Sequence, residues 1–184
     1  MKKVLKIFLL LVVVIGAYII YVFSSTGFFR TIENQMEGSI IKEVPIAGVE
    51  DITVDEDDQF AIFISYDRAA ERDGKPNKGA IYSMGLSDNS LPIKKLSEHI
   101  KVELLPHGIS LFQIDSTQHR LWVANHAKGE SIEIFDLFHR DSLVHIKTLK
   151  DEMIYAINDL VAVSEREFYF TNDHYYQYTL GRLA

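Results

Sequence analysis

Polar residues that could bind a metal ion recur in pairs along this sequence, each pair just before a short apolar run. The pairs are Glu50-Asp51, His107-Gly108 and Asn158-Asp159, and the positions Asp51, Gly108 and Asp159 are spaced by 57 and 51 residues. Three carboxylates and an amide carbonyl are hard oxygen ligands, which suit calcium, a cation that takes about 6–8 oxygens. A single Asp or Asn at the start of a strand usually accepts hydrogen bonds from turn amides instead. The metal-site prediction therefore depends on a fold that brings the pairs together.

Short runs rich in Ile, Val, Phe, Tyr and Thr alternate with polar turns from Gly48 onward, which indicates an all-β fold. The expected strands cover residues 51–54, 60–66, 80–85, 108–114, 120–125, 131–137, 143–149, 159–163 and 168–172. Each polar pair opens a unit of about 50 residues, a repeat length typical of β-propeller blades. A sandwich would not need the same pair at the start of each unit. In a propeller the innermost strand of every blade begins at the central channel, so we expect the three pairs to face one another there.

The composition fits a globular chain whose folded part attracts cations. Of 184 residues, 47% are apolar and 24% are charged. The net charge is −7, and three lysines lie within the first six residues, so the remainder carries 16 basic against 26 acidic residues, or −10. This charge argues against nucleic-acid binding and favours cations. The absence of cysteine excludes a thiol nucleophile, a disulfide scaffold, a Cys-ligated metal site and a lipid anchor on cysteine.

Other polar residues are interpreted as structural. The acidic run at residues 55–58 lacks the spacing and the glycine of an EF-hand loop, and it falls where a hairpin should turn, so we expect a solvated turn. Trp122 and the tyrosines are expected to pack in the core. Four histidines fall in turns or alternating strands and are predicted to be surface residues: His99, His119, His139 and His145.

The N-terminal segment is the clearest local signal. Between residues 4 and 23 only Lys6 and Gly16 are not apolar, and a helix over residues 7–23 would span about 25 Å, near the lower limit for crossing a bilayer. We interpret it as the uncleaved signal-anchor of a single-pass protein, with a cleaved signal peptide as the alternative. The lysines precede the span, which predicts a cytoplasmic N-terminus and a periplasmic or extracellular remainder. The predicted division of the chain is a transmembrane helix over residues 1–23, a linker over residues 24–47 and a partial propeller over residues 48–184.

Five stretches resemble the paraoxonase/arylesterase family in order and spacing. They are Gly48-Val49-Glu50-Asp51-Ile52, Pro106-His107-Gly108-Ile109-Ser110, Val123-Ala124-Asn125-His126, residues 157–163 and residues 168–175. The resemblance runs from about residue 48 to residue 176, and the five motifs in register make it specific.

The resemblance implies a six-bladed β-propeller that binds two calcium ions in its central tunnel and hydrolyses lactones and aryl esters. Carried over by position, Glu50 and Asn158 match ligands of a catalytic calcium. The matches to a deeper, structural calcium are Asp51, Asp159 and the backbone carbonyl of Ile109. His107 and His126 match a histidine dyad that activates water, with His107 as the base and His126 orienting it or relaying the proton.

Length separates this chain from a complete member of that family. Six blades of about 50 residues need roughly 300 residues, whereas residues 48–184 number 137, or about three blades. The family's other ligands of the catalytic calcium lie in later blades, so we expect this chain alone to be inactive. A fragment or a frameshifted gene is the favoured explanation, and a complementing C-terminal half or a stable half-propeller are the alternatives. The functional alternatives are a non-catalytic, membrane-tethered interaction module and a propeller resembling strictosidine synthase or gluconolactonase.

Overall fold

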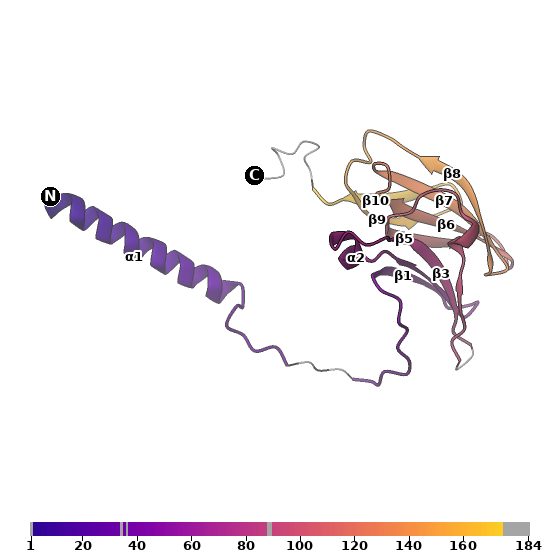
Figure 1. The fold of residues 1–184 in the computed structure, drawn as a ribbon, viewed down its shortest axis with the longest axis horizontal. Helices are drawn as coiled ribbons and strands as arrows, with labels where there is room; N and C mark the ends of the chain where they lie inside the picture. The colour runs from indigo at the N-terminus through magenta and orange to yellow at the C-terminus, as the bar shows by residue number, and fades with distance from the viewer. Residues whose placement is uncertain (1, 34, 36, 88–89, 175–184) are drawn as a thin grey trace. The chain divides into compact units, whose positions relative to one another are not determined.

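The computed structural model describes residues 2–33, 35, 37–87 and 90–174 (Figure 1). The chain divides into two compact units, Met1–Glu43 and Val44–Ala184. Tyr175 and Tyr176, where the family resemblance ends, lie outside the described residues.

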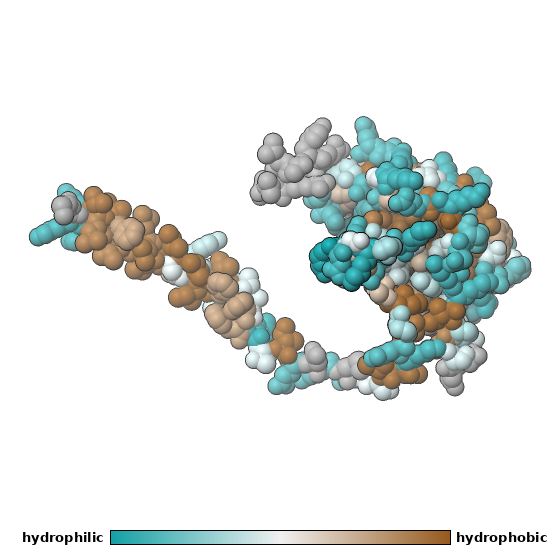
Figure 2. Space-filling model, in the orientation of Figure 1, coloured by the Kyte–Doolittle hydropathy of each residue, from teal (hydrophilic) through white to brown (hydrophobic). Residues whose placement is uncertain are grey.

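The first unit is dominated by one helix, α1 (Lys2–Ser25), two residues longer than predicted at its C-terminal end. It would extend about 36 Å, and it has no polar face, as the brown surface along its visible side shows (Figure 2). The helix ends where the hydroxyls of Ser25 and Thr26 bond back to the carbonyl of Val22 and Gly27 takes a φ of 74°. This helix is long and apolar enough to cross a membrane, a test that a signal sequence also passes.

The described residues of the second unit form three antiparallel sheets, each ordered as its strands follow in the chain. The first sheet comprises β1 (Val49–Asp55), β2 (Phe60–Ser65), β3 (Ala80–Gly85) and β4 (Ile93–Lys95). The second comprises β5 (Pro106–Gln113), β6 (Gln118–Asn125), β7 (Ser131–Phe138) and β8 (Ser142–Leu149). The third comprises β9 (Ile157–Ala162) and β10 (Phe168–Asn172). Two short helices, α2 (Arg68–Arg72) and the 3-10 turn Ser97–His99, lie in the connections.

The second sheet is buried on both faces, which explains the near-continuous apolar runs of its central strands. Leu121 and Val123 of β6 join a core shared with the first sheet, whereas Trp122 and Ala124 join a core shared with the third. Alternate side chains of a strand point to opposite faces, so one strand supplies both cores. The second sheet is therefore the middle layer of the described unit (Figure 1).

The prediction of a mostly β fold after Gly48 is confirmed, since all nine expected strands are present, and β4 is the one strand among the described residues that was missed. Trp122 is buried, as expected, but Tyr169 on β10 is 71% exposed, so a core role for all tyrosines is wrong. Successive four-stranded antiparallel sheets are compatible with neighbouring blades of a propeller.

Candidate functional site

The three polar pairs predicted from the repeat lie at the starts of β1, β5 and β9. These three strands are neighbours, with β5 in contact with both of the others. The ladder register breaks across each pair: between Val49 and Ile52 in β1, between Pro106 and Ile109 in β5, and between Ile157 and Leu160 in β9. Such irregularities re-aim side chains that would otherwise alternate between the two faces of a sheet.

Asp51 and Asp159 both contact the short segment Gly108-Ile109 of β5. Asp51 Oδ2 accepts a hydrogen bond from the Ile109 N–H at 2.8 Å. A Cβ atom on Gly108 would lie 2.5 Å from Asp159 Oδ1 and 2.8 Å from the carbonyl oxygen of Asn158. Only glycine therefore fits at position 108, and its missing side chain lets β5 approach β9 closely.

Glu50 lies between two cationic or potentially cationic side chains. Its Oε1 accepts from Arg68 Nε at 3.0 Å, and its Oε2 lies 3.8 Å from His107 Nε2. Arg68 begins α2, which is capped by the Asp67 carboxylate accepting from the N–H groups of Ala69 and Ala70. Nothing in the sequence pattern pointed to Arg68, because a five-residue helix has no periodicity to detect.

His107 and His126 form a direct pair across β5 and β6. His107 Nδ1 lies 3.1 Å from His126 Nε2, and the second nitrogen of His126, Nδ1, lies 2.8 Å from Glu130 Oε2. Both imidazoles are about one-fifth exposed, at 22% and 21%. The sequence predicted the two histidines but not Glu130, because the contact of Glu130 with His126 depends on the turn that follows β6.

Asn158 has a partner of its own in the third sheet. Its Nδ2 donates to Asp173 Oδ1, which leaves the amide carbonyl as the part of the side chain able to face a cation. Asp173 follows β10, and its N–H bonds to the carbonyl of Ala156. Asp173 was inside a recognised motif, but no role was assigned to it.

Comparison with known proteins places the chain in a family. The family model for arylesterases matches residues 74–183, more than half of the chain. The chain belongs to the arylesterase family. The predicted family resemblance is thereby confirmed.

Named relatives of this arylesterase-family chain match it over part of their length. It is 44% identical over 73 residues to serum paraoxonase/arylesterase 2 of Rattus norvegicus, covering 39% of this chain and 21% of the relative. It is 38% identical over 107 residues to serum paraoxonase/lactonase 3 of Mus musculus, covering 55% and 30%. The corresponding human lactonase 3 is 36% identical over 117 residues, covering 58% and 33%. The matched segments thus span a fifth to a third of these relatives.

The arylesterase match includes His107, His126, Asn158 and Asp159, whereas Glu50 lies before its first residue. The contacts of Glu50 with His107, and of Asp51 with Ile109, connect β1, which precedes the match, to the matched part of the chain.

The donors of the candidate calcium sites suit that cation by their chemistry, because all are oxygens and two of the carboxylates flank the same segment of β5. Asp51 Oδ1 and Asp159 Oδ1 each accept the N–H of the next residue at 2.7 Å, which shows that the two aspartates occupy equivalent positions in the repeat. Glu50, Asp51 and Asp159 do not form a group with ligand atoms all within 4.8 Å.

The part of the chain that the structure describes has one group of three such side chains, at the other end of β1. It consists of Asp55, Asp58 and His119. His119 is only 1% exposed, so its prediction as a surface residue is wrong; its Nε2 lies 2.8 Å from Asp55 Oδ2. Arg140 also pairs with Asp58 at 2.7 Å, and this cation offsets the local negative charge. The acidic run is a turn, as expected, but two of its carboxylates are tied to the core.

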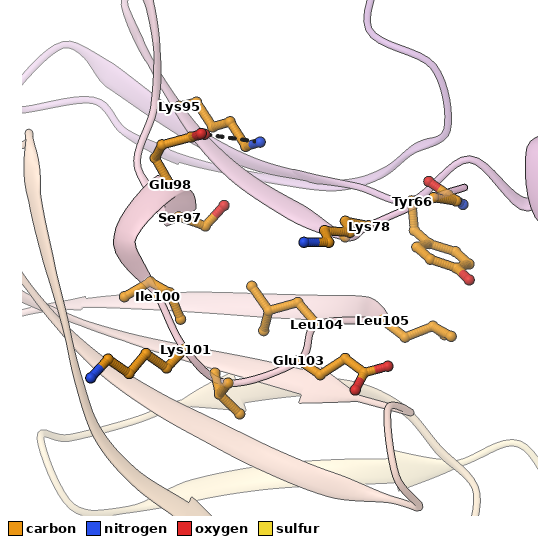
Figure 3. A pocket seen from close by; sticks show the side chains of 13 residues that line it. Tyr66, Lys78, Lys95, Ser97, Glu98, Ile100, Lys101, Glu103, Leu104 and Leu105 are labelled. Atoms are coloured by element: carbon orange, nitrogen blue, oxygen red, sulfur yellow. Dashed lines mark ion pairs between the residues drawn. The ribbon is translucent and has the colours of Figure 1, made fainter. Parts of the chain in front are cut away.

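A cavity of about 560 Å³ lies away from the polar pairs, beside the 3-10 turn and the segment leading to β5 (Figure 3). Its lining includes Lys78, Lys101 and Tyr66, together with the ion pair Lys95–Glu98 at 3.1 Å. Burial and the neighbouring Glu71 carboxylate raise the pKa of Tyr66. None of the predicted site residues lines this cavity, so it does not define the candidate site.

Proposed function

We propose that this chain carries the water-activating dyad and the first calcium donors of an ester or lactone hydrolase. The observation that carries the proposal is the contact between His107 and His126, formed beside Glu50 where β1, β5 and β9 begin. Membership of the arylesterase family supports ester hydrolysis as the reaction class.

In this proposal His107 is the general base. Its Nε2 takes a proton from a water molecule, and its Nδ1 is held by His126 at 3.1 Å, so the ring is fixed in orientation. The partial exposure of both rings allows water and a small ester to reach them.

Bound calcium would supply a Lewis acid that polarises the carbonyl of the substrate. Glu50 and Asn158 would hold one ion, and Asp51, Asp159 and the Ile109 carbonyl the other. Because Glu50 Oε1 is engaged by Arg68, its Oε2, on the side of His107, is the oxygen left for a cation or a water molecule. The non-catalytic interaction module remains the competing hypothesis, and it requires neither a cation nor a formed dyad.

We further propose that α1 anchors the protein as a single-pass helix over the predicted residues 1–23, with residues 24–47 as a linker. Lys2 and Lys3 at its start favour a cytoplasmic N-terminus. The partial propeller would then face the periplasm or the extracellular space.

A chimera tests the proposed activity directly. Residues 74–174 of this chain would replace the matching segment of mouse serum paraoxonase/lactonase 3, whose name assigns it lactone hydrolysis. We expect calcium-dependent hydrolysis of a lactone by the chimera, and a loss of roughly 100-fold or more in kcat on His107→Gln, the range of general-base catalysis.

The matched control is His139→Asn, because His139 is an exposed turn residue with a φ of 50° that Asn also adopts. This variant should keep the activity of the chimera. A folded chimera whose hydrolysis is the same with and without His107→Gln would contradict the proposed role of the dyad.

A further inference from the structure

Glu130 ends a continuous line of polar contacts that starts at Glu50. The line runs from Glu50 Oε2 to His107 Nε2 (3.8 Å), from His107 Nδ1 to His126 Nε2 (3.1 Å), and from His126 Nδ1 to Glu130 Oε2 (2.8 Å). Its four members come from β1, β5, the residue directly after β6 and the following turn, so they are brought together by the fold and not by closeness in sequence.

The chemistry of the two ends determines where the protons lie. An ionised carboxylate only accepts hydrogen bonds, so His126 must donate to Glu130 from Nδ1–H. A neutral imidazole has a single N–H, and the Nε2 of His126 is therefore an acceptor. The 3.1 Å contact then requires His107 to donate from Nδ1–H, which leaves the lone pair of His107 on Nε2.

The 3.8 Å distance between His107 Nε2 and Glu50 Oε2 agrees with this assignment. It is too long for a hydrogen bond, as expected when that nitrogen carries no proton. The basic nitrogen consequently points toward the carboxylate that is predicted to bind the catalytic cation.

Glu130 is held in place from two directions. The turn after β6 uses left-handed backbone at Lys128 (φ 54°) and Gly129 (φ 90°), which turns the chain so that Glu130 faces back to His126. Glu130 Oε2 also accepts the N–H of Ile157 at 3.2 Å, at the start of β9 and next to Asn158. Its side chain is only 29% exposed, and partial burial strengthens both contacts.

We propose that Glu130 is a positioning residue that holds His126 in its Nδ1–H tautomer and thereby keeps the lone pair of His107 on Nε2. This role in catalysis rests on the proposed function, whereas the tautomer itself does not. A carboxylate that fixes a tautomer through the second ring nitrogen is a known use of such contacts.

The test is ¹⁵N nuclear magnetic resonance of the full chain in detergent with labelled histidine, at about pH 9, well above the ordinary histidine pKa near 6.5. Nitrogen shifts distinguish protonated from unprotonated ring nitrogens, and variants His107→Gln and His126→Gln assign the signals. We expect His126 and His107 to show a protonated Nδ1 and an unprotonated Nε2. A protonated Nε2 on wild-type His126 would overturn the proposal.

Two variants test the role of Glu130 itself. Glu130→Gln keeps an oxygen acceptor, so it should retain the tautomer, whereas Glu130→Leu should redistribute the proton of His126 between its two nitrogens. Glu98→Gln is the matched control, since Glu98 pairs with Lys95 and contacts no histidine of the line. A folded Glu130→Leu protein with wild-type tautomers would overturn the proposal; if that variant does not fold, the wild-type and Glu130→Gln spectra still decide it.

These outcomes separate the two proposals. The expected tautomers together with an inactive chimera would retain the Glu130 inference and reject hydrolysis. An active chimera with the opposite tautomers would reject the Glu130 inference alone. In an active chimera, Glu130→Leu should lower kcat with little change in KM. The Glu130→Gln chimera should keep most of the kcat of the unsubstituted chimera.

Discussion

Asp51 gives the most direct test of calcium binding at the scale of single residues. Asp51→Asn preserves an oxygen that can accept from the Ile109 N–H, but it removes one negative charge, and the ligand charge count sets calcium affinity. We expect calcium binding to the full chain to weaken by about tenfold or more, or ~1.4 kcal/mol. Isothermal titration calorimetry in detergent measures this change.

The matched control for this prediction is Asp58→Asn, in the group formed with Asp55 and His119. It should leave the calcium affinity unchanged. Weakening in Asp58→Asn and none in Asp51→Asn would place the calcium at the other end of β1.

Residue types and spacing predicted the members of the candidate site, but not the partners that contact them. Glu50 and His107 were found because their motifs recur at the starts of strands. Arg68, the partner of Glu50, and Glu130, the partner of His126, lie in a short helix and a turn, where contacts depend on backbone geometry and not on periodicity. His119 was misplaced for a similar reason, because the Asp55 carboxylate that allows its burial is 64 residues away.

At the scale of elements, the fit of β5 against β9 depends on Gly108. Gly108→Ala forces a Cβ to within 2.5 Å of Asp159 Oδ1 and 2.8 Å of backbone atoms of β9, and overpacking of this kind costs about 1–3 kcal/mol. We expect the free energy of unfolding to fall by that amount in urea denaturation. Gly85→Ala is the control, since its Cβ would meet the ring of Pro92 at 3.3 Å from Cγ and 3.6 Å from Cδ; equal losses in both variants would contradict the close approach.

A buried carboxylate ties the second sheet together near the site. Glu133 is 1% exposed, and its two oxygens accept from four side chains: Asn125, Ser131, His145 and Thr148. Glu133→Leu leaves these groups without their acceptor, and breaking a buried polar network of this kind costs roughly 3–5 kcal/mol. Urea denaturation should show such a loss, with Glu98→Gln within about 0.5 kcal/mol of wild type; a loss under about 1 kcal/mol would mean that water replaces the carboxylate.

Strands were predictable because their apolar runs are long and bounded by turn residues. β4 was not predicted because it has only three residues, two of which are lysines, and because it directly follows Pro92. The burial of all but one residue of β7 could not be predicted from the sequence, because Glu133 and Asp136 interrupt its apolar run. This burial depends on the layers that cover β7 on both faces.

At the scale of the whole molecule, the proposed anchoring role of α1 can be tested by fractionation. We expect the full chain to stay with membranes after alkaline carbonate extraction, and a variant lacking Lys2–Ser25 to appear in the soluble fraction. Mass spectrometry of the membrane-bound protein should find the N-terminal segment intact. A soluble protein that has lost this segment would instead identify a cleaved signal peptide.

The proposed calcium sites draw few donors from this chain. The five proposed ligand residues, divided between two ions, supply fewer groups than the about six to eight oxygens that calcium takes. We therefore expect hydrolysis of phenyl acetate by the full chain to remain near the uncatalysed rate, with or without calcium. Calcium-dependent hydrolysis that disappears in Glu50→Gln would show that these donors suffice.

The register breaks at the starts of β1 and β9 release the pairs Glu50-Asp51 and Asn158-Asp159 from the alternation of the ladder, whereas the pair in β5 is fixed by Gly108. In a regular strand two consecutive residues point to opposite faces, so a change of either one disturbs a packed layer. Here the ladder resumes only after each pair, at Ile52, Ile109 and Leu160. A polar pair of this kind can change in type while the sheet that carries it stays the same. A designer could accordingly transplant Asn-Asp, the pair of β9, onto positions 50 and 51, to change the charge presented there without redesigning the scaffold.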